Sequence, residues 1–240
     1  MDPSYLKSEV AKIEWFHRID LGNGIVTPGV STPGLNVLPK DLSGVTVLDV
    51  GAADGAYSFE AERRGAKRVL ALDYYYWNRG WGSKAGFELA RKALESKVED
   101  MELDLFELTA ERIGQFDLVL LMGVLHMVRH PLLALERIFS VTGSRMILQA
   151  HLDMQYCNKP VMRFYPGREL ENDPEGWWSP NQPALEAMLK SAGFREIKRV
   201  WPESSLRYKL QKFRRAIVPR RKRSFLDALG QEWVVFHAWR

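Results

Sequence analysis

The chain has 240 residues, 46% of them hydrophobic, which is enough for one sizeable core and favours a single α/β domain with additions. It has no run of about 18 apolar residues and no apolar stretch of the signal-peptide type, so neither a membrane span nor a secretory signal is expected. Cys157 is the only cysteine, which excludes an intramolecular disulfide and favours a reducing, cytoplasmic setting. The net charge is +4, and nine Lys/Arg without one acid fall within residues 207–223.

The first 43 residues differ in composition from the rest. Residues from Ser4 to about Arg18 place apolar side chains on one stripe, which predicts a helix. Residues 21–34, LGNGIVTPGVSTPG, are rich in glycine and proline, which predicts a loop. Loops of this length in compact domains are usually functional or disordered, so 1–43 is interpreted as a helix and a lid loop preceding a domain over 44–240.

Apolar strands and helices alternate from residue 45 onward. The pattern predicts strands over 45–50, 68–73, 98–105, 116–122 and 145–150, and helices over 57–64, 87–96 and 132–139. Strands that read as continuous apolar runs are typical of a parallel sheet covered by helices on both faces. The fold class is therefore α/β, with a doubly wound, mostly parallel sheet.

The last third of the chain departs from this alternation. We expect an irregular insert over 152–179, a helix over 183–192, a strand over 194–201, a basic helix over 204–218 and a final strand over 233–239. A helical crossover of this length can return a strand in either direction, so the pattern leaves the orientation of the last strand open.

The first strand ends in VLDVGAADGAYSF, a glycine turn that leads into a helix. Gly51 and Gly55 let the backbone approach a ligand, and the free N–H groups of a helix N-terminus attract an anion. Asp73 and Asp104 end the second and third strands, where acids can accept hydrogen bonds from ribose hydroxyls and an adenine amino group. The candidate cofactor-binding residues are Asp49, Gly51, Ala52, Ala53, Gly55, Asp73, Tyr74, Asp104, Leu105, Met122 and Gly123.

The spacing D-x-G-x-x-x-G with acids after strands two and three resembles the class I, Rossmann-like methyltransferases that use S-adenosylmethionine (SAM). The resemblance implies that the glycine turn holds the methionine part, that Asp73 binds ribose and that Asp104 reads adenine. It also implies a seven-stranded sheet whose last strand is antiparallel, and SAM as cofactor. A nucleotide-binding domain without chemistry and an NAD enzyme are the alternatives.

The stretch MGVLHMVRHPLLAL is similar to a narrower family, the bacterial tRNA wobble-uridine carboxymethyltransferases and their shorter relatives. Those enzymes share the pattern M-G-V-L-Y-H-x-R-x-P and alkylate an oxygen with carboxy-SAM. Here His126 replaces the tyrosine that helps to hold the extra carboxylate, and Glu232 lies nearest to the position of a carboxylate-binding arginine. The large N-terminal part of the tRNA enzymes has no counterpart. The resemblance therefore implies plain SAM and a shorter relative that methylates a glycan or another metabolite.

Two histidines follow the fourth strand, and two interpretations of His126 stay open. It is either a general base that orients and deprotonates an acceptor hydroxyl, or a helix-turn histidine bonded to backbone. His151, at the end of strand five, is the second candidate base. His130 is interpreted as a cap of the next helix and Arg129 as a salt-bridge partner. A metal pair is disfavoured because Pro131 interrupts the helix that would align the two imidazoles.

Aromatic and arginine side chains gather in the insert, where they suit the binding of sugar rings, carboxylates or phosphates. The candidate acceptor-binding residues are Arg129, Tyr156, Arg163, Tyr165, Trp177 and Trp178, whereas Phe164 is expected to pack within a lid. The basic helix is either a solvated face or a site for RNA, an anionic membrane or a phosphate-carrying lipid-linked substrate. Three hypotheses remain: an O-methyltransferase for a small molecule or glycan, an RNA-modifying enzyme, and a SAM-binding module without activity.

Overall fold

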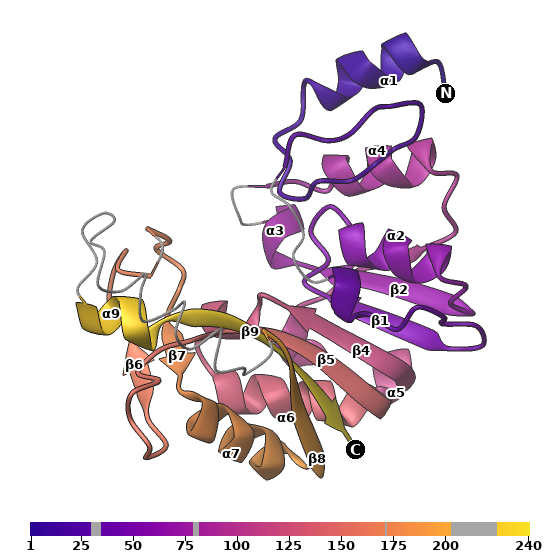
Figure 1. Cartoon of the computed structure of the whole chain (residues 1–240). Helices are drawn as coiled ribbons and strands as arrows, with labels where there is room; N and C mark the ends of the chain where they lie inside the picture. Colours follow the sequence, from indigo (N-terminus) through magenta and orange to yellow (C-terminus); the bar gives the residue numbers. More distant parts are fainter. Residues whose placement is uncertain (30–34, 79–81, 171, 203–224) are drawn as a thin grey trace. The chain divides into compact units, whose positions relative to one another are not determined.

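The computed structural model of the chain (Figure 1) describes residues 1–29, 35–78, 82–170, 172–202 and 225–240. These residues divide into two compact units. The first comprises Met1–Leu120 with Val141–Gly143, and the second comprises Leu121–Ser140 with Ser144–Arg240. The basic helix expected over 204–218 lies outside the described residues.

Seven strands form one sheet in the order β3-β2-β1-β4-β5-β9-β8. β1, β2 and β3 pair in parallel, whereas β9 is antiparallel to both β5 and β8. The mostly parallel sheet with an antiparallel last strand confirms the predicted Rossmann-like α/β fold. The elements before β4 (Phe116–Met122) are α1 (Pro3–Val10), η1 (Leu35–Val37), β1 (Thr46–Val50), α2 (Ala56–Arg63), β2 (Arg68–Asp73), α3 (Tyr75–Asn78), α4 (Ala85–Ala93), β3 (Glu99–Glu102), η2 (Leu105–Glu107) and α5 (Ala110–Ile113).

The core of the first unit forms where the apolar strands β1 and β2 meet α2. Val47, Leu48 and Leu70 are buried, because both faces of these central strands are covered. In the first unit, Figure 1 shows α2 lying along β1 and β2, with which it makes its main contacts. This packing fixes the turn between β1 and α2, where the sequence predicts the cofactor site.

The N-terminal helix is shorter than expected. Asp2 caps α1 by accepting a hydrogen bond from the Tyr5 amide at 2.9 Å, but the helix ends at Val10 and not near Arg18. The indole N–H of Trp15 donates to the Val10 carbonyl at 2.9 Å, so the chain folds back there. Residues 19–27 then form a tight hairpin-like loop with an antiparallel bridge between Asp20 and Val26.

The second unit contains the acceptor-side candidates. Its elements are η3 (Leu125–Met127), α6 (Pro131–Val141), β5 (Thr142–Leu152), β6 (Met162–Phe164), β7 (Trp178–Pro180), α7 (Gln182–Ala192), β8 (Glu196–Trp201), α9 (Phe225–Gly230) and β9 (Glu232–Trp239). The insert over 152–179 is therefore less irregular than predicted, because β5 reaches Leu152 and the insert supplies β6, which pairs with β7 as a two-stranded sheet. The buried Tyr165 anchors this small sheet, and its amide donates to the Trp177 carbonyl at 2.9 Å.

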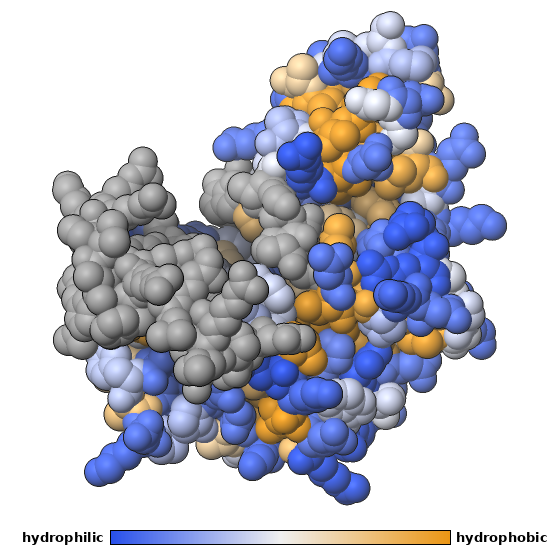
Figure 2. Space-filling view, viewed as in Figure 1, coloured by the Kyte–Doolittle hydropathy of each residue, from blue (hydrophilic) through white to orange (hydrophobic). Residues whose placement is uncertain are grey.

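On the face seen in Figure 2, blue hydrophilic residues predominate among the described ones, and orange apolar residues gather in patches between them. Leu132, Phe164 and Tyr156 are among the larger apolar side chains that remain exposed in the second unit. Among the described residues, no helix is both long enough and apolar enough to cross a membrane.

Candidate functional site

The turn between β1 and α2 is closed by backbone bonds from glycine and alanine residues. The amides of Gly51 and Ala52 donate to the Leu72 carbonyl of β2 at 2.7 and 3.1 Å. Gly55 has φ 85°, and a Cβ there would lie 2.7 Å from the rings of Phe59 and Phe87, so the position requires glycine. The N-cap residue Gly55 supplies no side-chain cap, and the positive end of the α2 dipole is suited to an anion.

Asp73 braces this turn, a role that the sequence analysis missed. One carboxylate oxygen accepts a hydrogen bond from the Ala53 amide and the other from the Tyr76 amide, both at 2.9 Å. The side chain is buried, and burial raises the pKa of its carboxyl above the usual range. Its role as a ribose ligand stays a prediction.

The second acid of the predicted pair lies close to the first along the sheet. Asp73 is in register with Glu102, and the Leu103 amide donates to the Asp73 carbonyl at 3.3 Å. Asp104 follows directly as the N-cap of η2, where it accepts a bond from the Phe106 amide at 2.9 Å. The structure thus brings Asp73 and Asp104 to the ends of neighbouring strands, while Tyr74 and Leu105 follow them, each partly buried.

The Asp49 side chain is buried behind the turn between β1 and α2 and does not lie on the surface of that turn. Its carboxylate accepts a bond from the Ser58 hydroxyl at 2.6 Å and is 1% exposed. Burial raises the pKa of Asp49 to about 7. The side chain therefore ties α2 to β1 and supports the turn from inside.

Two further residues of the first unit were not singled out by the sequence analysis. Asp54, within the turn, accepts hydrogen bonds from the Phe16 and His17 amides at 2.7 and 2.9 Å, and burial raises its pKa to about 6. His17 is buried, and burial lowers the pKa of its imidazole to about 3. Its Nδ1 has no hydrogen-bond partner among the described residues. The position of an acid inside a glycine turn could have predicted a role for Asp54. No sequence feature predicted a role for His17.

In the second unit, His126 lies on η3 with a buried ring. Burial lowers the pKa of its imidazole to about 4, so the ring is neutral near pH 7. Within the described part of the chain, Nδ1 finds no hydrogen-bond partner, unlike a helix-turn histidine bonded to backbone through that atom. The ring meets Trp233 edge-on with centroids 5.2 Å apart.

The second candidate base, His151, is buried near the end of β5. Its Nδ1 lies 2.7 Å from the Ser179 hydroxyl, and its ring meets Trp233 at 5.4 Å. Trp233 is in register with His151 because β9 pairs with β5. Both candidate bases therefore contact the same indole, which the sequence analysis did not identify.

Two predicted acceptor residues have partners within the protein. Tyr165 donates its hydroxyl to Asp153 at 2.5 Å, and Arg163 bonds Asp153 at 3.0 Å and Asp227 at 2.7 Å. Asp153 is 1% exposed, so these bonds neutralise a buried carboxylate. Arg163 and Tyr165 thus order the insert, and a direct contact to an acceptor stays a prediction for both.

Trp177 contacts both Arg129 and Phe164, and these three residues are called the ledge below. The guanidinium of Arg129 lies 4.5 Å over the Trp177 ring, which is a cation–π contact, and the expected salt bridge of Arg129 is not found among the described residues. Phe164 stacks on Trp177 with an interplanar angle of 13° and lies 4.8 Å from Trp178. Phe164 and Tyr156 are about half exposed, at 48% and 50%. Phe164 packs as expected but also offers an open face.

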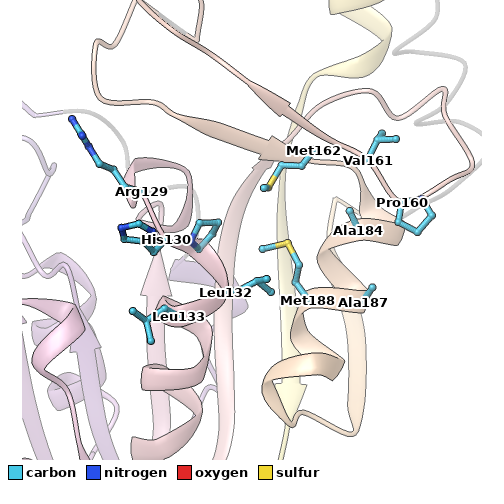
Figure 3. A pocket seen from close by; sticks show the side chains of 11 residues that line it. Arg129, His130, Leu132, Leu133, Pro160, Val161, Met162, Ala184, Ala187 and Met188 are labelled. Atoms are coloured by element: carbon cyan, nitrogen blue, oxygen red, sulfur yellow. The ribbon is translucent and has the colours of Figure 1, made fainter.

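An open, mainly apolar groove of about 620 Å³ lies between α6 and α7 in the second unit. Figure 3 shows Met162 and Met188 facing one another across it, with His130 and Leu132 on the α6 side. His130 precedes α6, where its carbonyl accepts a bond from the Ala134 amide at 2.9 Å, as expected of a residue that begins a helix. The described residues contain no group of three or more His, Cys, Asp or Glu side chains able to hold a metal ion.

Comparison with known families identifies the class. The family described as "Methyltransferase domain" matches residues 30–198, which is more than half of the chain. The chain belongs to this family and is a class I methyltransferase, the class whose methyl donor is SAM.

The chain is similar to individual curated relatives over part of their length. The chain is 32% identical over 165 residues to a tRNA U34 carboxymethyltransferase of Pseudomonas putida (strain W619), covering 66% of this chain and 48% of that protein. A protein of the same description from Colwellia psychrerythraea is 27% identical over 164 residues. The chain spans about half the length of these curated relatives.

Solved structures share the fold at low identity. The N-terminal domain of EvdMO1, crystallised with S-adenosylhomocysteine (SAH) and D-fucose, superposes with a TM-score of 0.69 at 18% identity, covering 100% of this chain and 97% of that one. A SAM-dependent methyltransferase from Mesorhizobium loti gives a TM-score of 0.54 at 18% identity, covering 87% and 96%. Both support the Rossmann-like assignment.

Proposed function

We propose that the chain is a SAM-dependent O-methyltransferase that methylates a hydroxyl of a small molecule or glycan. The observation that carries this proposal is the His126 imidazole, which is neutral near pH 7, buried, and without a hydrogen-bond partner at Nδ1 among the described residues. A buried polar atom normally has a partner, so the missing one is expected to come with the substrate.

The residues of the first unit fit the cofactor. The N-terminus of α2, whose N-cap residue is Gly55, suits the carboxylate of the methionine part, and the acids Asp73 and Asp104 suit the ribose hydroxyls and the adenine amino group. When bound, SAM supplies an electrophilic methyl group on a positively charged sulfur. An acceptor hydroxyl must lose its proton as it is methylated, and His126 is the residue proposed to orient that hydroxyl and take the proton. His151, held by Ser179, is the second candidate.

Plain SAM is the proposed donor because neither replaced position offers a binding site for an extra carboxylate. Glu232 is bonded through both oxygens to Arg199, at 3.3 and 3.1 Å. Arg199 also donates to the Gln182 side chain and the Pro202 carbonyl, so its guanidinium is already engaged. His126 is neutral, so it carries no charge to pair with a carboxylate.

A sugar or glycan acceptor is favoured by the ledge of Arg129, Phe164 and Trp177. Aromatic faces bind the apolar face of a sugar ring, and an arginine adds donors for its oxygens. The structural neighbour crystallised in the presence of D-fucose supports the same class of acceptor. Incubating the full chain with SAM and a panel of sugars and sugar nucleotides should release SAH with at least one of them. Release of SAH with tRNA alone would replace this proposal with the alternative below.

The alternative is modification of a tRNA wobble uridine, favoured by the curated relatives and by the basic residues 207–223. Neutralising Arg214, Arg215, Arg221 and Arg223 together should leave SAH affinity unchanged in either case. If RNA is the substrate, the wild-type chain should bind tRNA tightly, and this affinity should fall steeply as the salt concentration rises. The four-arginine variant should lose tRNA binding. Binding only to anionic vesicles would favour a lipid-linked glycan at the cytoplasmic membrane surface. Binding to neither would make the segment a solvated face.

A further inference from the structure

The segment between Trp15 and Gly29 is fixed onto the glycine turn. Asp54 of the turn accepts the amides of Phe16 and His17, and the Thr27 hydroxyl donates to the His17 carbonyl at 2.6 Å. A Cβ at Gly29 would lie 2.3 Å from that same carbonyl oxygen, so the returning chain passes directly over His17. The backbone of His17 is therefore held in place from both sides.

The side chain of His17 is less well satisfied than its backbone. It is 5% exposed, and burial keeps its imidazole neutral. In the described chain its Nδ1 has no hydrogen-bond partner, although buried polar atoms are nearly always bonded. A phenylalanine would fill the same space without an unpaired atom, so packing alone does not account for a histidine here.

The surroundings of the ring indicate which ligand group could meet it. The His17 ring packs edge-on against Tyr57 at 5.9 Å, and Tyr57 lies in the first turn of α2. That turn follows Gly55, which supplies no side-chain cap, and it forms the positive end of the α2 dipole, which attracts an anion. Asp49 bonds Ser58 of the same turn. The ring contact with Tyr57 thus places the buried imidazole, whose Nδ1 has no partner among the described residues, against the start of α2.

We propose that His17 binds the amino-acid end of SAM through Nδ1, together with the first turn of α2. This inference rests on the proposed function for the cofactor itself. The α-carboxylate is the only anionic group of SAM, which assigns that end to the helix start, whereas Asp73 and Asp104 suit the hydrogen-bond donors of the adenosine end. The N-terminal segment is then a part of the cofactor site, coupled to it through Asp54.

Two ligands separate this role from a structural one. SAH contains the amino-acid end, whereas 5′-methylthioadenosine keeps the adenosine and the sulfur but lacks the carboxylate and the amine. Both are titrated calorimetrically into the full chain and into two variants. His17→Phe keeps the ring and removes the polar atom, while His17→Asn restores an amide atom at the Nδ1 position.

His17→Phe should weaken SAH about 5- to 50-fold, the loss of one or two hydrogen bonds to a charged group, and change 5′-methylthioadenosine less than twofold. His17→Asn should recover a large part of the SAH affinity. Should His17→Phe fail to fold, His17→Leu takes its place in the same comparison. Equal losses for both ligands, or unchanged SAH affinity, would overturn the assignment of His17. A wild-type chain that binds neither ligand would instead overturn the cofactor proposal and this inference with it.

Discussion

The carboxylate of Asp73 is predicted to stabilise the glycine turn and to bind the ribose of the cofactor. A single substitution tests both roles. Asp73→Asn replaces one acceptor oxygen with a donor, which leaves the Ala53 or the Tyr76 amide unpaired and removes charge from the ribose position. We expect SAH affinity to fall at least tenfold and the free energy of unfolding to fall by about 1–3 kcal/mol. Calorimetry and chemical denaturation measure the two effects.

Asp104→Asn is the matched control, because the Asp104 side chain accepts a bond from the local Phe106 amide as the cap of η2. It should lower SAH affinity with a smaller loss of stability. Wild-type SAH affinity in Asp73→Asn would show that this acid does not contact the cofactor.

His126 is predicted to set the pH dependence of turnover once an acceptor is known. Its neutral form accepts the proton and is populated above its lowered pKa of about 4. The kcat/KM value should therefore stay flat from about pH 8 to 5 and fall as the pH drops through 4. His126→Ala should reduce turnover about 10²- to 10⁴-fold with SAM affinity nearly intact.

His130→Ala is the control for that measurement, since His130 immediately precedes α6 and lines the apolar groove. A loss below tenfold in His126→Ala would move the proton-accepting role to His151. A fall in the wild-type kcat/KM near pH 6.5 would also contradict the assignment of His126 as the base, because its buried ring is expected to titrate near pH 4.

At the scale of elements, Asp54 is predicted to hold the N-terminal segment on the turn. Asp54→Ala leaves the buried amides of Phe16 and His17 without an acceptor, so residues 15–29 should open while α2 stays folded. Hydrogen exchange should show protection lost over 15–29 and retained over Ala56–Arg63. Asp41→Ala removes an exposed aspartate that bonds the local Ser43 amide, and it should leave both regions unchanged. Unchanged exchange over 15–29 in Asp54→Ala would exclude this anchoring role.

The elements also show where sequence patterns lose their predictive power. β1, β2 and β4 follow from continuous apolar runs, and the glycine turn follows from Gly51 and Gly55. The end of α1 could not be predicted from such patterns. It depends on Asp54, which is distant in sequence and accepts hydrogen bonds from the amides of Phe16 and His17. Likewise, the bracing of Ala53 by Asp73 depends on a backbone position that no periodicity encodes.

For the whole molecule, the order of strands and helices predicted the fold class, and the family resemblance predicted the antiparallel last strand. The periodicity of the sequence left the orientation of the last strand open. That orientation determines which residue of β9 contacts His126 and His151. Because β9 returns antiparallel to β5, Trp233 lies opposite His151 and also contacts His126. The site residue Trp233 therefore follows from topology and not from any motif around it.

The central claim is that this class I methyltransferase uses plain SAM. Parallel calorimetric titrations of SAM and carboxy-SAM into the full chain test it most directly. With Glu232 bonded to Arg199 and His126 neutral, SAM should bind at least as tightly as carboxy-SAM. A clear preference for carboxy-SAM, or no binding of SAM, would contradict the claim.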